Sequence, residues 1–214
     1  MIALVIGATG ATGEPLVHAL LENNTIEKVV IFVRKSLQWQ HEKLTIHIVD
    51  FDNLQAWKDL IKGDIAFSVL GTTLKDAGSK EAQYKVDYTY QYEFAKAAKE
   101  NDIAQFILLS AMGADANSAI FYSRIKGELE NSVQALHFDK LSIFKPGALI
   151  RPNSTRKGEK FGVKFIQFLN TLGIGKRYKP LATKDLAIAM MHQAFEQKNA
   201  LEIVGFKDIL KYVK

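Results

Sequence analysis

The sequence contains no cysteine among its 214 residues. This absence excludes disulfide bonds, catalysis by a thiol, and zinc sites built on cysteinate ligands. No apolar run approaches the roughly 20 residues of a membrane-spanning helix, and no stretch rich in Pro, Gly or Ser separates two domains. The phosphate-loop motif GxxxxGK[ST] is also missing, which removes the usual kinase interpretation. We therefore expect a single domain over residues 1–214, with no membrane span.

Signals for targeting and for metal binding are equally scarce. Met1 leads directly into an apolar run, without the basic segment and cleavage site of a signal peptide. Together with the absence of cysteine, this predicts a cytoplasmic protein. The five histidines are scattered along the chain, so we expect no metal site.

The charge is unevenly distributed. The chain has 28 basic and 23 acidic residues, a formal net charge of +5. Residues 151–185 hold nine basic side chains against only Glu159 and Asp185. Such a segment suits an anionic cofactor, an acidic substrate, a nucleic acid or a membrane surface. No helix-turn-helix pattern supports a nucleic-acid partner, and none is expected.

Predicted strands and helices alternate along most of the chain, with no internal repeat. Strands are predicted at residues 2–6, 28–33, 44–49, 65–70, 106–109, 141–144 and 201–204, and helices after residue 13 and near residues 53–61, 79–99, 120–136, 163–170 and 184–197. The alternation predicts an α/β fold, a doubly wound parallel sheet of Rossmann type with a small C-terminal segment that caps the substrate. In such sheets ligands bind beyond the carboxyl ends of the strands.

A glycine-rich string, GATGATG, joins the first predicted strand to the first predicted helix. At this turn glycine permits positive φ and lets backbone approach a pyrophosphate, while the helix N-terminus offers N–H groups to the phosphates. The predicted cofactor-binding residues of this loop are Gly7, Thr9, Gly10, Ala11, Thr12 and Gly13. The position between strand and helix favours a dinucleotide site over an ordinary turn.

The residue after the second predicted strand indicates which cofactor binds. An NAD site usually has an acidic residue here to hold the ribose 2′-hydroxyl, whereas this chain has Arg34 followed by Lys35. A guanidinium can grip a 2′-phosphate with forked hydrogen bonds, so we expect a preference for NADP(H). NAD(H) is the alternative, in which both side chains only solvate the strand end.

A candidate catalytic set follows the fifth predicted strand. Tyr122-Ser-Arg-Ile-Lys126 spells YxxxK on a predicted helix, and this spacing puts both side chains on one helical face. A nearby ammonium would lower the pKa of the Tyr122 phenol from its ordinary value of about 10 and make it a usable proton donor and acceptor. Ser110, at the end of the strand, would hydrogen-bond a substrate carbonyl. The alternative is a pair on the helix surface.

A second YxxxK, Tyr92 to Lys96, occurs in the preceding predicted helix. No strand-ending serine precedes it closely, and its tyrosine continues a stripe with Tyr84 and Tyr88 at helical spacing. Such a stripe is typical of packing. We therefore assign the chemistry to Tyr122.

In this order, the strings GATGATG, LGTT, LLSAMGA, FYSRIKGELE and FKPGALIRP resemble the short-chain dehydrogenase/reductase superfamily. The strings VDF, LGTTLKDAG, KVDY and LLSAMGAD resemble its atypical members related to the Tat-interactive-protein oxidoreductase. The resemblance implies the serine, tyrosine and lysine roles for Ser110, Tyr122 and Lys126. No asparagine corresponds to the fourth catalytic residue of the larger family, so the proton relay is not assigned.

The resemblance also implies further contacts with the cofactor. Lys126 would hold the nicotinamide ribose. The remaining implied cofactor-binding residues are Asp50 and Phe51 beside the adenine, Leu70, Gly71, Thr72 and Thr73 along the central portion, and Pro146, Gly147, Ala148 and Leu149 near the nicotinamide.

These patterns together predict an NADP(H)-dependent oxidoreductase that acts on a small carbonyl compound or its alcohol, as a monomer or homodimer. A non-catalytic redox-sensing protein and an isomerase or dehydratase that uses the cofactor transiently are the alternatives. Residues 146–214 would contribute the substrate pocket, and Arg156 could hold a substrate carboxylate. The basic residues of this segment could instead only solvate a helical flap.

Overall fold

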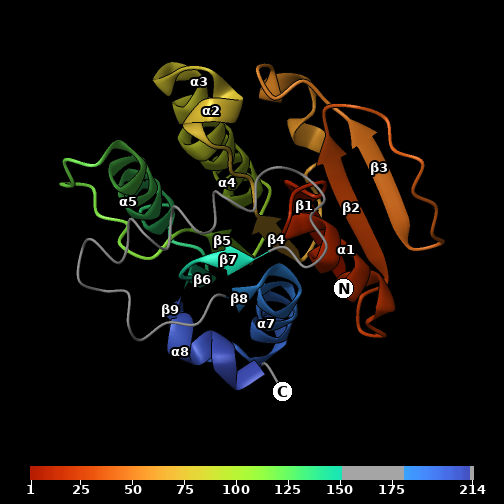
Figure 1. The fold of residues 1–214 in the computed structure, drawn as a ribbon. Helices are drawn as coiled ribbons and strands as arrows, with labels where there is room; N and C mark the ends of the chain where they lie inside the picture. Colours follow the sequence, from red (N-terminus) through yellow and green to blue (C-terminus); the bar gives the residue numbers. More distant parts are fainter. Residues whose placement is uncertain (151–180, 213–214) are drawn as a thin grey trace.

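The structure, a computed structural model, describes residues 1–150 and 181–212. Seven parallel strands form the central sheet in the order β3-β2-β1-β4-β5-β6-β9 (Figure 1). They are β1 (Ile2–Ile6), β2 (Lys28–Val33), β3 (Leu44–Ile48), β4 (Ile65–Ser68), β5 (Gln105–Leu109), β6 (Lys140–Lys145) and β9 (Leu201–Gly205). In register, Val5 of β1 lies opposite Ile31 of β2 and Phe67 of β4. The predicted α/β fold with a doubly wound parallel sheet is confirmed.

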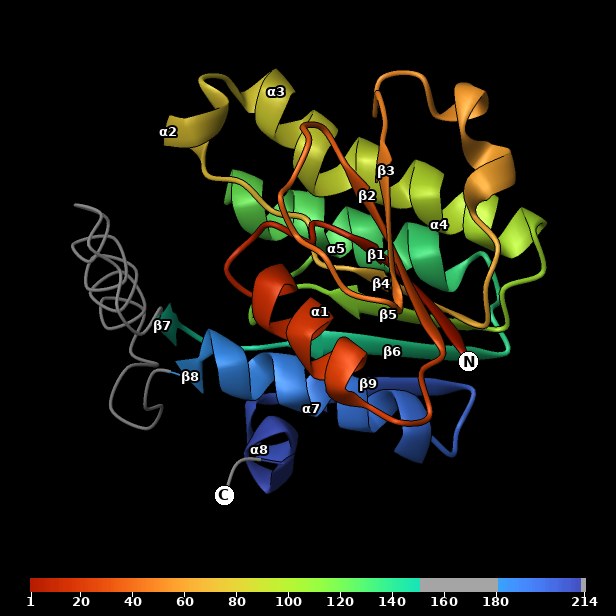
Figure 2. The same ribbon diagram turned by 90° about the vertical axis from the view of Figure 1, so that its right-hand side faces the viewer.

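Helices cover both faces of the sheet (Figure 2). One face carries α1 (Gly13–Glu22) and α7 (Thr183–Glu196), and the other carries α4 (Tyr90–Glu100) and α5 (Phe121–Gln134). The shorter elements are α2 (Leu74–Ala77), α3 (Lys80–Tyr84), α8 (Phe206–Ile209), the 3₁₀ turns η1 (Leu54–Ala56), η2 (Lys58–Leu60) and η4 (Leu210–Tyr212), the π-helical turn η3 (Lys85–Thr89), and the paired strands β7 (Leu149–Ile150) and β8 (Leu181–Ala182).

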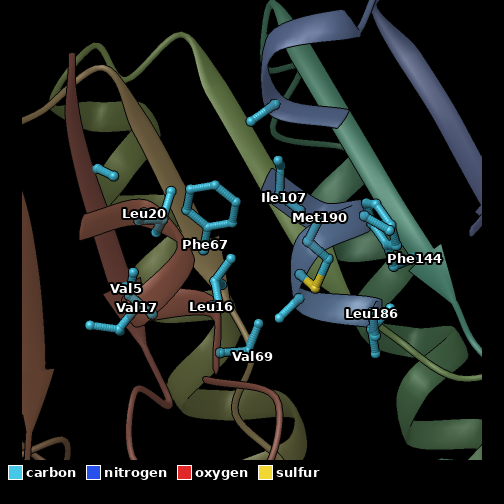
Figure 3. Close-up of a cluster of buried hydrophobic side chains, with 14 of the residues drawn as sticks. Val5, Leu16, Val17, Leu20, Phe67, Val69, Ile107, Phe144, Leu186 and Met190 are labelled. Carbon is cyan, nitrogen blue, oxygen red and sulfur yellow. The ribbon is translucent and has the colours of Figure 1, made fainter. Parts of the chain in front are cut away.

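Side chains of β1 alternate between two hydrophobic cores, as the period of a strand requires. Val5 belongs to the core under α1 and α7, whereas Leu4 and Ile6 belong to the core under α4 and α5. Figure 3 shows Leu16 of α1 and Met190 of α7 in the first core. Each of these side chains is fully buried, and burial of one such side chain stabilises the fold by about 1.5–3 kcal/mol.

The helix predicted at residues 53–61 is replaced by two 3₁₀ turns, η1 and η2. The Asn101 side chain donates hydrogen bonds to the carbonyl groups of Lys58 (2.8 Å) and Ile61 (3.0 Å). Trp57 donates from its ring nitrogen to the carbonyl of Asp50 at 2.9 Å. These tertiary hydrogen bonds satisfy carbonyl groups in and around the two short turns, so the segment does not need a continuous helix to pair them.

The helix predicted at residues 79–99 is interrupted by the π-helical turn η3. The side-chain amide of Gln91, in the first turn of α4, donates to the carbonyl groups of Val86 (3.2 Å) and Asp87 (3.0 Å) of this turn. Gln91 is itself held by Ser68 of β4, whose hydroxyl donates to its side-chain oxygen at 2.9 Å. The interruption therefore depends on a contact with the sheet.

The C-terminal predictions are partly covered by the structure. The helix predicted at residues 184–197 corresponds to α7, and the strand at 201–204 corresponds to β9. The helix predicted at residues 163–170 lies outside the described residues. None of the helices in the described part of the chain has the length and apolar character needed to span a lipid bilayer.

Candidate active site

The strand order reverses direction between β1 and β4, since β2 lies on one side of β1 and β4 on the other. The crevice beyond such a reversal is where open parallel sheets bind ligands. At its base, Gly7 has a φ of +82°, and a Cβ on it would lie 2.6 Å from the carbonyl carbon of Val69. Glycine is therefore required for the loops after β1 and β4 to meet this closely.

Helix α1 begins at Gly13, whose added Cβ would lie 2.0 Å from the carbonyl oxygen of Gly7. Thr12, at the N-cap, makes no side-chain capping hydrogen bond. Within residues 1–150 and 181–212, no acceptor pairs with the backbone N–H of Ala11 or Thr12. Because the N-terminus of a helix also carries partial positive charge, this loop can receive an anionic group.

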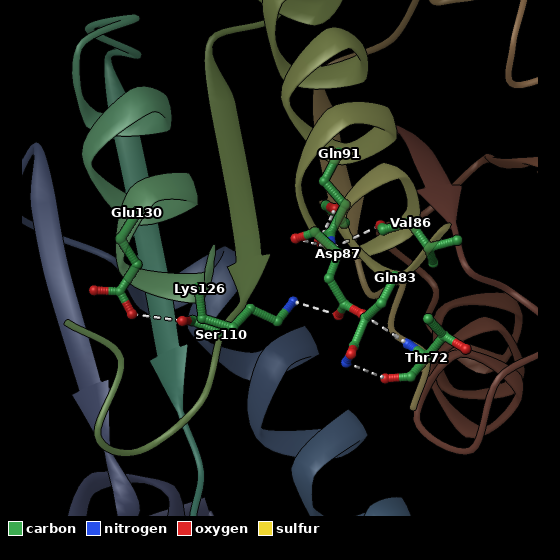
Figure 4. Close-up of polar contacts among 9 residues, drawn as sticks. Thr72, Gln83, Val86, Asp87, Gln91, Ser110, Lys126 and Glu130 are labelled. Atoms are coloured by element: carbon green, nitrogen blue, oxygen red, sulfur yellow. Dashed lines mark hydrogen bonds and ion pairs between the residues drawn. The ribbon is translucent and has the colours of Figure 1, made fainter. Parts of the chain in front are cut away.

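Ser110 directly follows β5 and is buried. Its hydroxyl donates to Glu130 Oε1 of α5 at 2.5 Å (Figure 4). The other oxygen of Glu130, Oε2, forms an ion pair of 3.0 Å with Lys145 Nζ at the end of β6. Lys145 also donates to the carbonyl of Ala114 at 3.4 Å. Ser110 therefore ends a polar chain that connects β5, α5 and β6.

Lys126 projects from α5 toward Asp87 of η3 (Figure 4). Its Nζ lies 3.3 Å from Asp87 Oδ1, and the two side chains are only 2% and 0% exposed. Asp87 Oδ2 accepts a hydrogen bond from the backbone N–H of Thr72 at 3.2 Å. Burial raises the pKa of the Asp87 carboxyl, and the charge of Lys126 opposes that rise. The pair compensates the cost of burying an ammonium group.

Sequence reasoning did not assign Asp87 to the site, although the string KVDY that contains it was part of the family resemblance. The signal that could have found it is a YxxxK lysine on a buried helical face, because such a lysine requires a carboxylate partner. The π-helical turn places that carboxylate, and turns of this kind are frequent at functional sites.

Tyr122 lies one helical turn before Lys126 on α5 and is partly buried. Burial raises the pKa of its phenol, and the negative charge of Asp87 raises it further. The lowering predicted from the sequence is therefore wrong for this structure. The reason is first that burial disfavours the charged phenolate, and second that the negative charge of Asp87 acts in the same direction and offsets the positive charge of Lys126.

The second YxxxK has different surroundings. The ring of Tyr88 packs against those of Tyr84 and Tyr92, with centroids 4.8 and 5.8 Å apart. Lys96 is exposed and pairs with Glu100 one turn later at 4.0 Å. The predicted packing stripe is confirmed.

The side chains predicted to contact the adenosine portion of a cofactor lie at the ends of β2 and β3. Arg34 and Lys35 are exposed directly after β2. Asp50 is also exposed after β3, but the Phe51 ring is buried against Trp57, with centroids 5.5 Å apart. Arg34, Lys35 and Asp50 therefore face solvent, whereas the Phe51 side chain belongs to the core.

The remaining predicted residues follow β4 and β6. They are Leu70, Gly71, Thr72 and Thr73 in the loop after β4, Pro146, Gly147 and Ala148 in the loop after β6, and Leu149 at the start of β7. The carbonyl of Pro146 accepts a hydrogen bond of 3.0 Å from the N–H of Met112, which joins the loops after β5 and β6. Arg156 lies outside the described residues, so its contact with substrate and the contribution of residues 146–214 to a substrate pocket stay predictions.

Comparison with known proteins identifies the family. A family model described as NAD(P)H-binding matches residues 7–157. The chain belongs to the NAD(P)H-binding family. Protein HTATIP2 of Rattus norvegicus is 36% identical over 166 residues, which cover 75% of this chain and 68% of that protein. FMP52 of Saccharomyces cerevisiae is 31% identical over 221 residues, which cover 98% of this chain and 95% of that protein. The resemblance to atypical short-chain dehydrogenase/reductases is confirmed.

Solved structures of the same fold include enzymes in complex with NAD. The UDP-glucuronic acid 4-epimerase of Bacillus cereus, in complex with NAD, matches with a TM-score of 0.70 at 18% identity, covering 96% of this chain and 77% of that chain. The enzyme WbmH of Bordetella bronchiseptica, in complex with NAD⁺, matches with a TM-score of 0.72 at 17% identity, covering 95% and 74%. At such low identity, the likeness establishes the Rossmann-type fold.

The names of the relatives correct one prediction. FMP52 is named a mitochondrial protein in Saccharomyces cerevisiae, Candida albicans and two further fungi, at 30–33% identity to this chain. This contradicts the cytoplasmic location predicted from the sequence. The prediction was wrong because a lack of cysteine excludes disulfide bonds without distinguishing one compartment from another.

A groove of about 570 Å³ adjoins the glycine-rich loop of this NAD(P)H-binding fold. Its described lining includes Gly10, His18 and Glu22 beside α7 residues Lys184 and Ile188. None of the three catalytic candidates is part of that lining. The groove is therefore separate from the polar groups around Ser110 and Lys126.

Proposed function

We propose that this protein is an NADP(H)-dependent oxidoreductase that transfers a hydride between the nicotinamide and a carbonyl compound or its alcohol. The observation that carries the proposal is the buried Lys126, one turn after Tyr122 on α5, together with Ser110 at the carboxyl end of β5. A buried lysine beside a tyrosine is costly to fold and is typical of a site where protons move.

The residues present fit a pyridine dinucleotide. The glycine-rich loop leaves the N–H groups of Ala11 and Thr12 without acceptors in the described part of the chain, as a pyrophosphate site requires. Lys126 has three N–H donors, and Asp87 is the one described residue with which it forms an ion pair. Its other donors would hold the nicotinamide ribose. When bound, the nicotinamide supplies or accepts the hydride.

The side chains of this chain manage the proton. In reduction, the Tyr122 phenol donates its proton to the substrate oxygen while that oxygen gains charge, and the resulting phenolate regains a proton from water. The ammonium of Lys126 would favour the phenolate, whereas burial and the negative charge of Asp87 oppose it. In oxidation, the same steps run in reverse.

A direct test is the consumption of NADPH by the purified protein with a panel of aldehydes and ketones, followed by absorbance. Turnover that depends on the carbonyl compound supports an oxidoreductase. Binding of NADPH without consumption by any member of the panel would contradict it and favour a redox-sensing protein or an enzyme with no net redox change.

Cofactor preference provides a quantitative prediction. Because Arg34 is exposed at the end of β2, we expect NADPH to bind at least tenfold more tightly than NADH, about 1.4 kcal/mol. Arg34→Ala should remove this preference, measured by calorimetric titration with both cofactors. Lys28→Ala, at the opposite end of β2, serves as the matched control. Equal affinities in the wild-type protein would remove Arg34 from the proposed role.

Two glycines of the loop should respond differently to alanine. Gly13→Ala would place a Cβ 2.0 Å from the carbonyl oxygen of Gly7, so we expect a loss of about 2 kcal/mol or more in the free energy of unfolding. At Gly10 the corresponding distance is 3.1 Å, which requires the Gly7 carbonyl to shift by only a few tenths of an ångström, so Ala should cost much less stability there than at Gly13. Gly10→Ala should instead weaken NADPH binding by about tenfold or more, because the methyl group keeps the pyrophosphate from the backbone. Denaturant unfolding and cofactor titration of both variants decide this, and unchanged NADPH affinity in Gly10→Ala would speak against the loop.

A further inference from the structure

The hydroxyl group of Ser110 is already engaged within the protein. A serine has one proton to donate and two lone pairs that accept. In the structure the proton is donated to Glu130 Oε1, and Ser110 is buried. A carbonyl oxygen accepts hydrogen bonds only, so Ser110 has no proton left for the substrate carbonyl that the sequence analysis assigned to it.

The direction of this hydrogen bond follows from the charge on Glu130. Glu130 Oε2 forms an ion pair of 3.0 Å with the ammonium of Lys145. An ionised carboxylate can only accept, so the proton between Ser110 and Glu130 belongs to the serine. Lys145 is in turn fixed by the carbonyl of Ala114 at 3.4 Å.

We propose that the Glu130–Lys145 pair makes Ser110 a hydrogen-bond acceptor, so that the site selects carbonyl substrates bearing a neighbouring hydroxyl group. The Tyr122 phenol then donates to the reacting carbonyl oxygen of the substrate. The neighbouring hydroxyl group of the substrate donates to Ser110 Oγ. Glu130 acts through Ser110 and is a positioning residue. This inference rests on the proposed function, because it takes the crevice at Ser110, Tyr122 and Lys126 as the reaction site.

The matched probes are α-hydroxyacetophenone and acetophenone, which differ by one hydroxyl group. We expect wild-type protein to favour the hydroxyketone by about tenfold or more in kcat/KM, since a buried acceptor left unpaired discriminates strongly. Glu130→Gln keeps the size of the side chain, but its amide can donate a hydrogen bond to Ser110 Oγ. The serine O–H can then turn away from residue 130 and donate to the substrate. The preference should then fall about tenfold, mainly through KM, with kcat changed less.

Two further variants separate this role from a purely structural one. Lys145→Met removes the ion pair that holds the Glu130 carboxylate beside Ser110 and should lower the preference in the same direction. In a Ser110→Ala background, Glu130→Gln should change nothing further. Glu128→Gln is the control, because Glu128 lies on the same helix and pairs with Arg124 at 3.9 Å. A lower melting temperature in Glu130→Gln with an unchanged preference would overturn the proposal, and Lys145→Met decides the matter if Glu130→Gln does not fold.

Binding measured by ligand-observed NMR separates this inference from the proposed function. If neither ketone is reduced but the hydroxyketone binds more tightly, and Glu130→Gln removes that difference, the acceptor role of Ser110 is supported and the reductase activity is not. If the two ketones bind wild-type protein equally, or neither binds, the proposed substrate class is overturned.

Discussion

Replacing Tyr122 by Phe is expected to lower kcat about a thousandfold while leaving the affinity for NADPH nearly unchanged. The substitution removes the one proton that the phenol donates to the substrate oxygen, and positioned acid catalysis of this kind contributes about 10²–10⁴ in rate. The ring itself stays in place on α5, so packing is preserved. Steady-state rates with the best carbonyl substrate, together with calorimetric titration of NADPH, provide the measurement.

Tyr92→Phe is the matched control, because Tyr92 begins the other YxxxK and packs in an aromatic stripe with Tyr88. It should retain most of the activity. A large loss of rate in Tyr92→Phe with an active Tyr122→Phe would reverse the assignment of the proton donor.

Replacing Asp87 by Asn is expected to shift the pH dependence of carbonyl reduction to lower pH by about one unit or more. Burial raises the pKa of Tyr122 and the charge of Asp87 raises it further, so the neutral isostere removes the second of these effects and leaves the charge of Lys126 uncompensated. Reduction requires the protonated phenol, so its rate falls as the pH rises above the pKa of Tyr122. In Asp87→Asn that fall should begin at lower pH, and alcohol oxidation, which requires the phenolate, should extend to lower pH.

The measurement is kcat/KM against pH in both directions for wild-type protein and variant. Asp139→Asn is the control, because Asp139 precedes β6 at the other end of the sheet and pairs with Lys99 at 3.4 Å. A pH profile of Asp87→Asn that coincides with the wild-type profile would show that Asp87 does not act on Tyr122.

The sequence by itself determined the elements that are visible within a short window. Apolar strands and amphipathic helices alternate with their own periods, and this alternation was sufficient to predict the parallel sheet. The glycine-rich loop and YxxxK were also readable, because each depends on the spacing of neighbouring residues. Arg34 was placed correctly at the end of β2 for the same reason.

Only the tertiary structure decided which charges meet. Asp87 reaches Lys126, and Glu130 joins Ser110 to Lys145, across elements that are distant in sequence. No periodic pattern records such pairs, because they depend on the order of strands in the sheet and on a π-helical turn held by a buried contact. The pKa of Tyr122 follows from burial and from a charge on another helix, so spacing along α5 alone gave its direction wrongly. Local pattern thus determined the framework, whereas the electrostatics of the site arose from long-range packing.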